Sequence, residues 1–238
     1  MTARAVQHAL RTISSPTKAK SSAWFFKTGP GQYGEGDQFI GVTVPEQRVI
    51  AKKFQELSLI EIQKLLASTV HEDRLTALFI LVGQYQRAKR TNAEKQFVTL
   101  YLDERQHINN WDLVDSSAPY ILGDWLVTHP DERTILAKLA GESSIWSKRI
   151  AILATASFIK NREFEPTLRL AEQFLSEHHD LMHKATGWML REIGKKDQPT
   201  LAAFLEKHAA AMPRTMLRYA IEKFSPAERQ TYLSIKGR

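Results

Sequence analysis

The sequence predicts an all-α protein, and three observations support that fold class. Apolar residues recur at three- and four-residue spacing, which is the period of an amphipathic helix. Residues that favour helix starts precede several of these stretches, and no stretch shows the alternating pattern of a half-buried strand. The predicted helical segments are 45–56, 58–67, 71–88, 92–103, 131–140, 145–160, 164–176, 181–195, 198–209 and 213–223.

Two kinds of signal mark the starts of these helices. Ser58 and Thr91 are each followed three residues later by a glutamate, Glu61 and Glu94, which is the pattern of a capping box. Prolines also stand where helices are predicted to begin, because the first turn does not need the missing N–H group. These prolines are Pro45, Pro130, Pro166, Pro199, Pro213 and Pro226.

A weak internal repeat appears when the longer helices are aligned. The stretches HEDRLTALFILVGQY, NNWDLVDSSAPYILG, SKRIAILATASFI and MHKATGWMLREIG each place a polar residue before small and apolar ones. That position is Arg74, Asp112, Arg149 and Lys184, at spacings of 38, 37 and 35 residues. A period of about 35–40 residues with two helices per unit predicts a HEAT-like helical-repeat solenoid. We expect residues 1–238 to form one such domain, although an array of four-helix bundles would give similar periodicity.

The repeat also predicts a basic surface. In a solenoid, equivalent helices of successive repeats form the concave side, so Arg74, Arg149 and Lys184 would share one surface, with Lys148 and Arg191 nearby. A basic concave groove suits the phosphate backbone of a nucleic acid. Alternatively, these side chains lie on solvated faces or extend along apolar surface with only their charged ends in water. Charge spacing alone favours neither interpretation.

Length and composition narrow the class further. A chain of 238 residues is long enough to bury a sizeable core. Its net charge of +7 favours an anionic partner, such as a nucleic acid or an anionic membrane surface. The absence of cysteine excludes disulfides, thiolate zinc sites and cysteine nucleophiles, and agrees with a reducing cytoplasm. The longest apolar runs, ALFILV and IAILA, are much shorter than the roughly 20 residues of a membrane span.

The N-terminal region has two unusual stretches. Residues before Glu35 contain basic and serine residues but no acidic one, which resembles a mitochondrial transit peptide. The aromatic stretch WFFKTG that follows favours folded structure instead. The glycine-rich stretch GPGQYGEGD (29–37) has no GKS or GKT after it and does not match a dinucleotide-binding fingerprint. We therefore expect an irregular connector at about residues 28–38.

The stretch WDLVD (111–115) is the first candidate site. Asn109 or Asn110 is expected to cap a helix that runs to Gly123 except at Pro119. Trp111 and Asp115 are four residues apart, so they share one face of the helix. On the pattern alone, a core tryptophan beside helix-start carboxylates that favour the helix dipole is the simpler interpretation.

Two further stretches contain candidate functional residues. GWMLRE (187–192) places Trp188 three residues before Arg191, and by itself the pattern favours a core tryptophan. HHDLMH places His179 and His183 at the spacing of metal ligands, but neither an HExxH glutamate nor a third ligand accompanies them. We therefore expect no metal site. There is also no GxSxG serine motif.

Four stretches together resemble one known family. FIGVTVPEQRVIAKKF, WDLVDSSAPYILGDWLVTHPDE, IWSKRIAIL and KATGWMLREIGK occur in the order and at the distances of the AlkD-like DNA alkylation repair glycosylases. The resemblance extends from about residue 39 to 195. It departs from the family at Asn110, where relatives often have a second tryptophan.

The resemblance implies a role for each matching residue. It implies that Asp115 is the catalytic aspartate, and that Trp111 and Trp188 line the sugar and backbone of the damaged nucleotide. It implies phosphate contacts for Arg149 and Arg191, to which Lys148 and Lys184 are added as further basic residues that bind DNA. The family is a group of HEAT-like, all-α DNA glycosylases that excise cationic N3- and N7-alkylpurines, such as 3-methyladenine and 7-methylguanine, without obligatory base flipping.

The function expected from this resemblance is hydrolysis of the N-glycosidic bond in double-stranded DNA that carries alkylated bases. We expect a monomer that needs no cofactor or metal, contacts no membrane and works in the cytoplasm at the nucleoid. One alternative is a non-catalytic HEAT-repeat protein that binds distorted or branched DNA. Another is a protein scaffold whose basic face meets an acidic partner.

Overall fold

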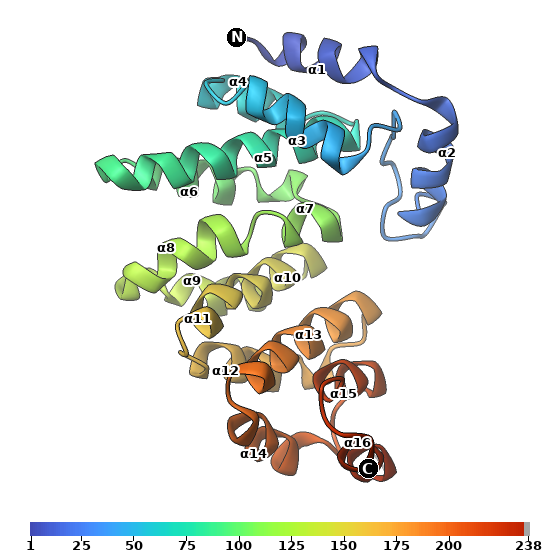
Figure 1. Cartoon of the computed structure of the whole chain (residues 1–238), viewed down its shortest axis with the longest axis vertical. Helices are drawn as coiled ribbons and strands as arrows, with labels where there is room; N and C mark the ends of the chain where they lie inside the picture. Colours follow the sequence, from blue (N-terminus) through green and yellow to red (C-terminus); the bar gives the residue numbers. More distant parts are fainter. Residues whose placement is uncertain (236–238) are drawn as a thin grey trace. The chain divides into compact units, whose positions relative to one another are not determined.

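The computed structural model describes residues 1–235, and the regular structure of that range is helical (Figure 1). No strand occurs within residues 1–235, where one isolated parallel bridge joins Gln38 to Val70. The predicted all-α fold class is therefore confirmed. The chain divides into two compact units, unit 1 from Met1 to Ser117 and unit 2 from Ala118 to Arg238. The expectation of a single repeat domain stays a prediction.

Unit 1 is built around one long helix, α5, which contacts α1, α3, α4, α6 and α7. The core between these helices includes Leu10 of α1, Ile62 of α4 and Leu78 of α5, which are all fully buried. The elements are α1 (Ala3–Thr12), α2 (Pro16–Phe25), α3 (Val44–Lys53), α4 (Leu59–Leu66), α5 (His71–Ala88), η1 (Lys89–Thr91), α6 (Lys95–Asp103), η2 (Arg105–His107) and α7 (Trp111–Asp115).

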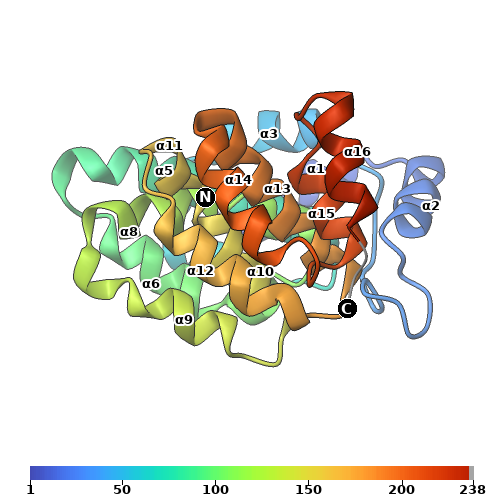
Figure 2. The ribbon, with the colours of Figure 1, turned by 90° about the horizontal axis from the view of Figure 1, so that it is seen from below.

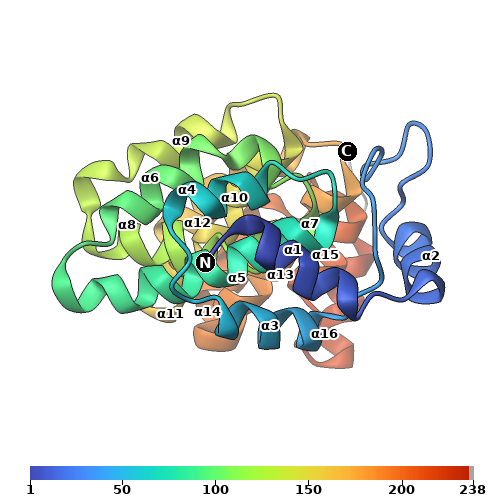
Figure 3. The same cartoon turned by 90° about the horizontal axis from the view of Figure 1, so that it is seen from above.

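The N-terminal residues form two helices that the sequence pattern did not predict. Helix α1 buries only Ala3, Val6 and Leu10, which is too short an apolar stripe to stand out from its polar neighbours. Helix α2 buries none of its residues. Figures 1 and 3 show α2 set apart from the other helices of unit 1, with a long connector (residues 26–43) leading back to α3. Residues 26–43 contain turns but no helix or strand.

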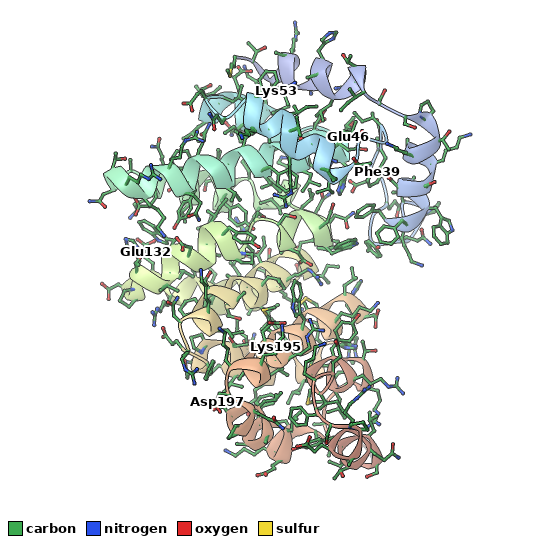
Figure 4. All side chains as sticks on the ribbon, viewed as in Figure 1. Phe39, Glu46, Lys53, Glu132, Lys195 and Asp197 are labelled. Atoms are coloured by element: carbon green, nitrogen blue, oxygen red, sulfur yellow. The ribbon has the colours of Figure 1, made fainter. Side chains whose placement is uncertain are left out.

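Both predicted capping boxes are wrong. The Ser58 side chain makes no cap bond, because Glu61 accepts from the backbone N–H of Ala3 at 2.7 Å and from Lys64 instead. Thr91 lies in a 3-10 turn and donates to the carbonyl of Ala88, and α6 begins only at Lys95. A capping box does form at Thr43, whose backbone N–H donates to Glu46 at 2.7 Å. Figure 4 labels Glu46 and Lys53 on α3.

Unit 2 is centred on helix α13, which contacts α10, α11, α12, α14 and α15. Figure 2 shows α13 flanked by α14 and α15. The elements are η3 (Pro119–Gly123), α8 (Asp124–Thr128), η4 (Pro130–Glu132), α9 (Thr134–Ala140), α10 (Ile145–Ala154), α11 (Ala156–Lys160), α12 (Glu165–Gln173), η5 (Phe174–Ser176), α13 (Asp180–Lys196), α14 (Gln198–His208), α15 (Arg214–Ala220) and α16 (Pro226–Ser234).

Several predicted helices are shorter or interrupted. The segment 145–160 is two helices, α10 and α11, which meet at Thr155, a buried residue whose hydroxyl donates to the carbonyl of Ile152. The helix expected from Trp111 to Gly123 ends at Asp115, and Pro119 begins a π-helical turn. Helix α16 is absent from the predicted segments, although Pro226 was placed at a helix start, and Ser225 and Glu228 form its capping box. The predicted prolines do lie at or near helix starts.

The repeat positions Arg74, Asp112, Arg149 and Lys184 all lie in the first two turns of a helix, on α5, α7, α10 and α13. Arg74 does not line a surface as expected. Its side chain is buried, donates to Asp37 and to the carbonyl of Ser68, and therefore holds unit 1 together. The four residues of the repeat therefore share a position near the start of a helix, but they do not form a row of exposed cations. None of the helices within residues 1–235 is both long and apolar enough to cross a membrane.

Candidate functional site

Helix α7 presents the two residues that the sequence singled out. Asn110 caps it, as predicted, by accepting from the backbone N–H of Trp111 at 2.8 Å. Trp111 and Asp115 are half-buried, whereas the three residues between them are buried. The spacing of four residues therefore places the indole and the carboxylate on the one partly exposed face of this short helix.

The indole of Trp111 lies against a stack of rings. It stacks on Phe26 with ring centres 5.2 Å apart, and Phe25 meets it edge-on at 5.9 Å. Phe26 in turn stacks on Phe39 at 5.0 Å, and Phe39 stacks on the imidazole of His71 at 4.6 Å. Figure 4 labels Phe39, which lies in the connector. The stack thus links α7 through the connector to the first residue of α5.

Behind this stack, His71 bridges two carboxylates. Its Nδ1 lies 3.0 Å from Asp37 Oδ2, and its Nε2 lies 2.8 Å from Asp112 Oδ2. The guanidinium of Arg74 donates to the other oxygen of Asp37 at 2.5 Å, and the amide of Asn110 donates to Asp37 at 3.1 Å. We call the group of Asp37, His71, Arg74 and Asp112 the His71 clamp.

The charges of the clamp compensate one another. Burial by itself would lower the pKa of His71, but the charge and hydrogen bond of Asp112, with the hydrogen bond of Asp37, raise the pKa to about 9. Burial would likewise raise the pKa of Asp37, but the hydrogen bond from His71 and the charge of Arg74 hold it below its usual value. At neutral pH the clamp therefore holds an imidazolium and a guanidinium between two carboxylates.

Asp112 and Asp115 have different surroundings, although they are three residues apart. Asp112 is buried and accepts from His71 and from the backbone N–H of Leu113, so it holds α7 in place. Asp115 is half-buried, and its charge adds to burial in raising the pKa of Tyr101. The Tyr101 hydroxyl lies 3.1 Å from that of Ser117. A fully buried tyrosine therefore lies behind the more exposed aspartate.

The remaining predicted site residues lie in unit 2. Arg149 is buried on α10 and donates to the carbonyl of Leu181, at the start of α13, at 2.6 Å. Lys148 beside it pairs with Glu177 at 2.6 Å, and its hydrogen bond holds the pKa of Glu177 below the usual value. Lys184 pairs with Asp180 at 2.7 Å, one turn earlier on α13. These cations all have protein partners in the free molecule.

Trp188 is half-buried on α13, so it is not a plain core residue. Its indole N–H donates to Glu192 at 3.1 Å, one turn later. Arg191 pairs with the same Glu192 and with Glu222. The preceding Gly187 is required by packing, because a Cβ there would lie 2.5 Å from the backbone oxygen of Met216 in α15.

The histidines of HHDLMH belong to the start of α13. The ring of His179 caps the helix by accepting from the backbone N–H of Leu181 at 3.2 Å, and burial lowers its pKa, which favours this neutral acceptor. His183 Nε2 lies 2.6 Å from the carbonyl of Glu177. Among residues 1–235, no group of three or more His, Cys, Asp and Glu side chains is placed to hold a metal ion.

Unit 1 therefore brings Trp111 and Asp115 together on one face, and unit 2 brings Lys148, Arg149, Lys184, Trp188 and Arg191 onto two contacting helices, α10 and α13. Sequence reasoning missed the His71 clamp, the supporting rings of Phe26 and Phe39, and the carboxylates that pair with the cations of unit 2. One signal was available. HEDR is a run of four polar residues that opens an otherwise apolar segment, and such residues need partners when they are buried.

The fold and these residues define a class, namely all-α helical-repeat proteins that carry partly exposed tryptophans and carboxylates among many basic side chains. The family model described as DNA alkylation repair enzyme matches residues 6–224. The chain belongs to this family. The resemblance to the AlkD-like DNA alkylation repair proteins is thereby confirmed at the level of the family.

A solved structure supports the same fold. The "Predicted DNA alkylation repair enzyme from Enterococcus faecalis" matches with a TM-score of 0.70 over 90% of this chain and 97% of that chain, at 18% sequence identity. At this identity the likeness shows the shared helical-repeat fold. No curated protein matches the chain.

Proposed function

We propose that this protein is a DNA glycosylase that hydrolyses the N-glycosidic bond of N3- and N7-alkylated purines, such as 3-methyladenine and 7-methylguanine. The proposal rests on the arrangement of α7. Trp111 and Asp115 share a partly exposed face of this helix, while the neighbouring Asp112 is buried in an ion pair. Membership of the DNA alkylation repair enzyme family supports the substrate class.

The chemistry suits a single carboxylate. An N3- or N7-alkylated purine already carries a positive charge, so it leaves as a neutral base and needs no general acid. Of the two carboxyl groups that glycoside hydrolases normally use, one is then sufficient. The deoxyribose develops oxocarbenium character, and an ionised Asp115 about 4 Å away would stabilise it by about 4 kcal/mol at an effective dielectric near 20. Asp115 would also orient the attacking water.

The tryptophans are proposed to contact the damaged nucleotide. Indole faces attract cations, and such contacts contribute about 0.5–2 kcal/mol. Trp111 has one face on Phe26 and is half-buried, so the supporting rings fix its orientation while part of it is accessible. We assign Trp188 the same kind of contact from unit 2.

The basic residues of unit 2 are proposed to bind phosphates. We assign this role to Lys148, Arg149, Lys184 and Arg191. Because Lys148, Lys184 and Arg191 are paired with carboxylates in the free protein, a DNA phosphate would compete with Glu177, Asp180 and Glu222 for them. Binding should therefore depend on salt, as counterion release requires. We propose that the protein acts as a monomer. We also propose that it needs no cofactor, because the substrate itself supplies the cationic leaving group.

An excision assay tests the proposal. Wild-type protein should release 7-methylguanine and 3-methyladenine from methylated duplex DNA, as measured by chromatography of the free bases. Asp115→Asn should release them about 1,000-fold more slowly, which corresponds to the loss of about 4 kcal/mol of transition-state stabilisation. Asp131→Asn, at an exposed acidic residue, is the matched control and should keep the wild-type rate.

Absence of release by the wild-type protein, or equal release by wild type and Asp115→Asn, contradicts the catalytic assignment. Duplex binding without release, with preference for a branched junction over the methylated duplex, would instead indicate the alternative of a non-catalytic DNA-binding protein. Circular dichroism confirms that each variant is folded before the rates are compared.

A further inference from the structure

The start of α5 is the most densely bonded part of unit 1. Its first four residues, His71, Glu72, Asp73 and Arg74, are all almost completely buried. Burying four consecutive ionisable side chains is unfavourable unless each has partners of opposite charge or hydrogen-bond donors. Three of the four, His71, Glu72 and Arg74, bond to the connector, whereas Asp73 does not.

Glu72 holds the C-terminal half of the connector. Its carboxylate accepts from the backbone N–H groups of Ile40, Gly41 and Val42 at 2.8–3.3 Å. Gly41 has a φ of +78°, and a Cβ there would lie 2.1 Å from the backbone oxygen of Ser15. Three N–H groups converge on one carboxylate only because the backbone takes this left-handed, glycine-dependent turn.

Asp73 holds a different element and provides a useful comparison. It accepts from Gln7 of α1 at 3.1 Å and from Ser68 at 2.8 Å, and Arg11 lies 3.5 Å away. None of these three partners belongs to the connector or to α7. Asp73 is therefore as buried as its neighbours, but it bonds to α1 and to the turn before α5.

His71 holds the connector and α7 at the same time. Its two ring nitrogens lie on opposite sides of the ring, one 3.0 Å from Asp37 of the connector and the other 2.8 Å from Asp112 of α7. The charged groups around it are Asp37, Asp112 and Arg74, and its ring face lies against Phe39. Both nitrogens can donate only in the protonated ring, so the geometry matches an imidazolium between two carboxylates.

The same contacts determine where Trp111 lies. Asp112 is the next residue on α7, so its bond to His71 fixes the first turn of that helix. Asp37 and Phe39 lie two residues apart in the connector, and Phe39 supports Phe26, which supports the indole. The connector backbone packs closely at this point. A Cβ at Gly34 would lie 2.3 Å from the backbone oxygen of Phe26.

We propose that His71 is a positioning residue, which joins Asp37 of the glycine-rich connector to Asp112 of α7 and thereby sets the orientation of Trp111 and Asp115. The glycine-rich connector is accordingly part of the site. It supplies Asp37 to the clamp and Phe26 and Phe39 to the rings beneath Trp111. The consequence for catalysis rests on the proposed glycosylase function, whereas the consequence for the geometry of α7 does not.

The first experiment measures geometry without activity. The chain has five tryptophans, and labelling with 5-fluorotryptophan gives each a fluorine NMR signal, with the Trp111 signal assigned from Trp111→Phe. In His71→Gln, a side chain that cannot donate on opposite sides, the Trp111 signal should shift and broaden. Asp37→Asn should have the same effect. In Asp73→Asn it should keep its wild-type position, and the signals of Trp125, Trp146 and Trp188 in unit 2 should stay unchanged in all variants.

The second experiment measures excision with the same proteins at a temperature where all are folded. His71→Gln should lower kcat by about 100-fold, the size of effect that a misplacement of about 1 Å produces. Its Kd for duplex DNA, measured by fluorescence anisotropy, should stay within about threefold of wild type. Asp73→Asn should keep the wild-type kcat, although it is also less stable.

The two readouts separate two kinds of failure. If wild-type protein releases no base, the proposed function is wrong, and the NMR signals still decide whether His71 positions Trp111. If the Trp111 signal is unchanged in both His71→Gln and Asp37→Asn, the positioning role is wrong. The same conclusion follows if His71→Gln and Asp73→Asn lower kcat equally, because His71 would then act only through stability.

Discussion

At the scale of single residues, the three aspartates between Asn110 and Leu126 differ in what surrounds each carboxylate. Asp112 is buried in an ion pair with His71, Asp115 is half-buried beside Tyr101, and Asp124 is half-buried at the start of α8. A buried, paired carboxylate is held by its partner and cannot approach a substrate. Of the two aspartates on α7, Asp115 is the more exposed, which supports its proposed contact with the substrate.

The charge of His71 should make stability depend on pH. Its pKa is about 9 in the folded protein against 6.5 for an unperturbed histidine. Because the folded value is higher, the stabilisation is fully present below about pH 6.5 and is lost as the pH rises through about 9. The free energy of unfolding should fall by about 3 kcal/mol at most over that range. Urea denaturation at pH 6, 7.5 and 9 measures it.

Two variants assign this pH dependence. His71→Gln should be less stable at pH 6 and should show a flatter profile between pH 6.5 and 9. His8→Gln, at an exposed residue of α1, should keep the wild-type profile. A profile in His71→Gln as steep as that of wild type would show that another group is responsible.

At the scale of elements, the connector is ordered by backbone contacts that require glycine. The backbone N–H of Gly34 donates to Lys27, and Asp37 donates to Gly34 in turn. These bonds bring residues 26 and 37 into the same turn. The glycine-rich composition that predicted an irregular connector therefore belongs to a tightly packed one.

Alanine substitutions distinguish packing from flexibility. Gly34→Ala should destabilise the protein by about 2–3 kcal/mol, because its Cβ would lie 2.3 Å from the backbone oxygen of Phe26. Gly83→Ala, within α5 where an added Cβ would meet no atom beyond its own helix backbone within 4 Å, should stabilise it by about 0.5–1 kcal/mol. Thermal denaturation followed by circular dichroism measures both. Equal changes in the two variants would contradict the packing argument.

At the scale of the whole molecule, fewer basic side chains are available to an anionic partner than the net charge of +7 suggests. Many of the basic side chains discussed above are paired with carboxylates, among them Lys148 with Glu177 and Arg191 with Glu222. Partly exposed pairs of this kind contribute little to stability. Under the proposed function, the protein's own carboxylates would compete with the phosphates of DNA for these cations.

That competition predicts opposite effects for the two partners of one pair. Glu177→Gln should strengthen duplex binding, because it frees Lys148 from its carboxylate, and Lys148→Gln should weaken it. Loss of one phosphate contact should also reduce the slope of log K against log salt by about 0.9 in Lys148→Gln. Anisotropy titrations between 50 and 200 mM salt measure both quantities. Weaker binding by Glu177→Gln would contradict the proposed role of Lys148.

The sequence predicted much of the fold because helix periodicity and helix-start chemistry are local. The segment 71–88 coincides with α5, and Asn110 does cap α7. Predictions that depended on a specific hydrogen-bond partner were less accurate. The side chain of Glu61 was expected to cap its own helix, but it bonds to Ala3, 58 residues away, because the folded chain offers that backbone N–H group as a stronger partner.

By itself, the sequence determined the all-α class, the family motifs and the shared face of Trp111 and Asp115, because these depend on residue type and on spacing along one helix. Tertiary structure alone decided which charges are available. It buried Arg74 and Asp112 and left Asp115 half-buried, since the His71 clamp joins residues 37, 71, 74 and 112 through contacts that no local pattern encodes. Whether a charged residue is buried in an ion pair or left partly exposed therefore depends on distant parts of the chain.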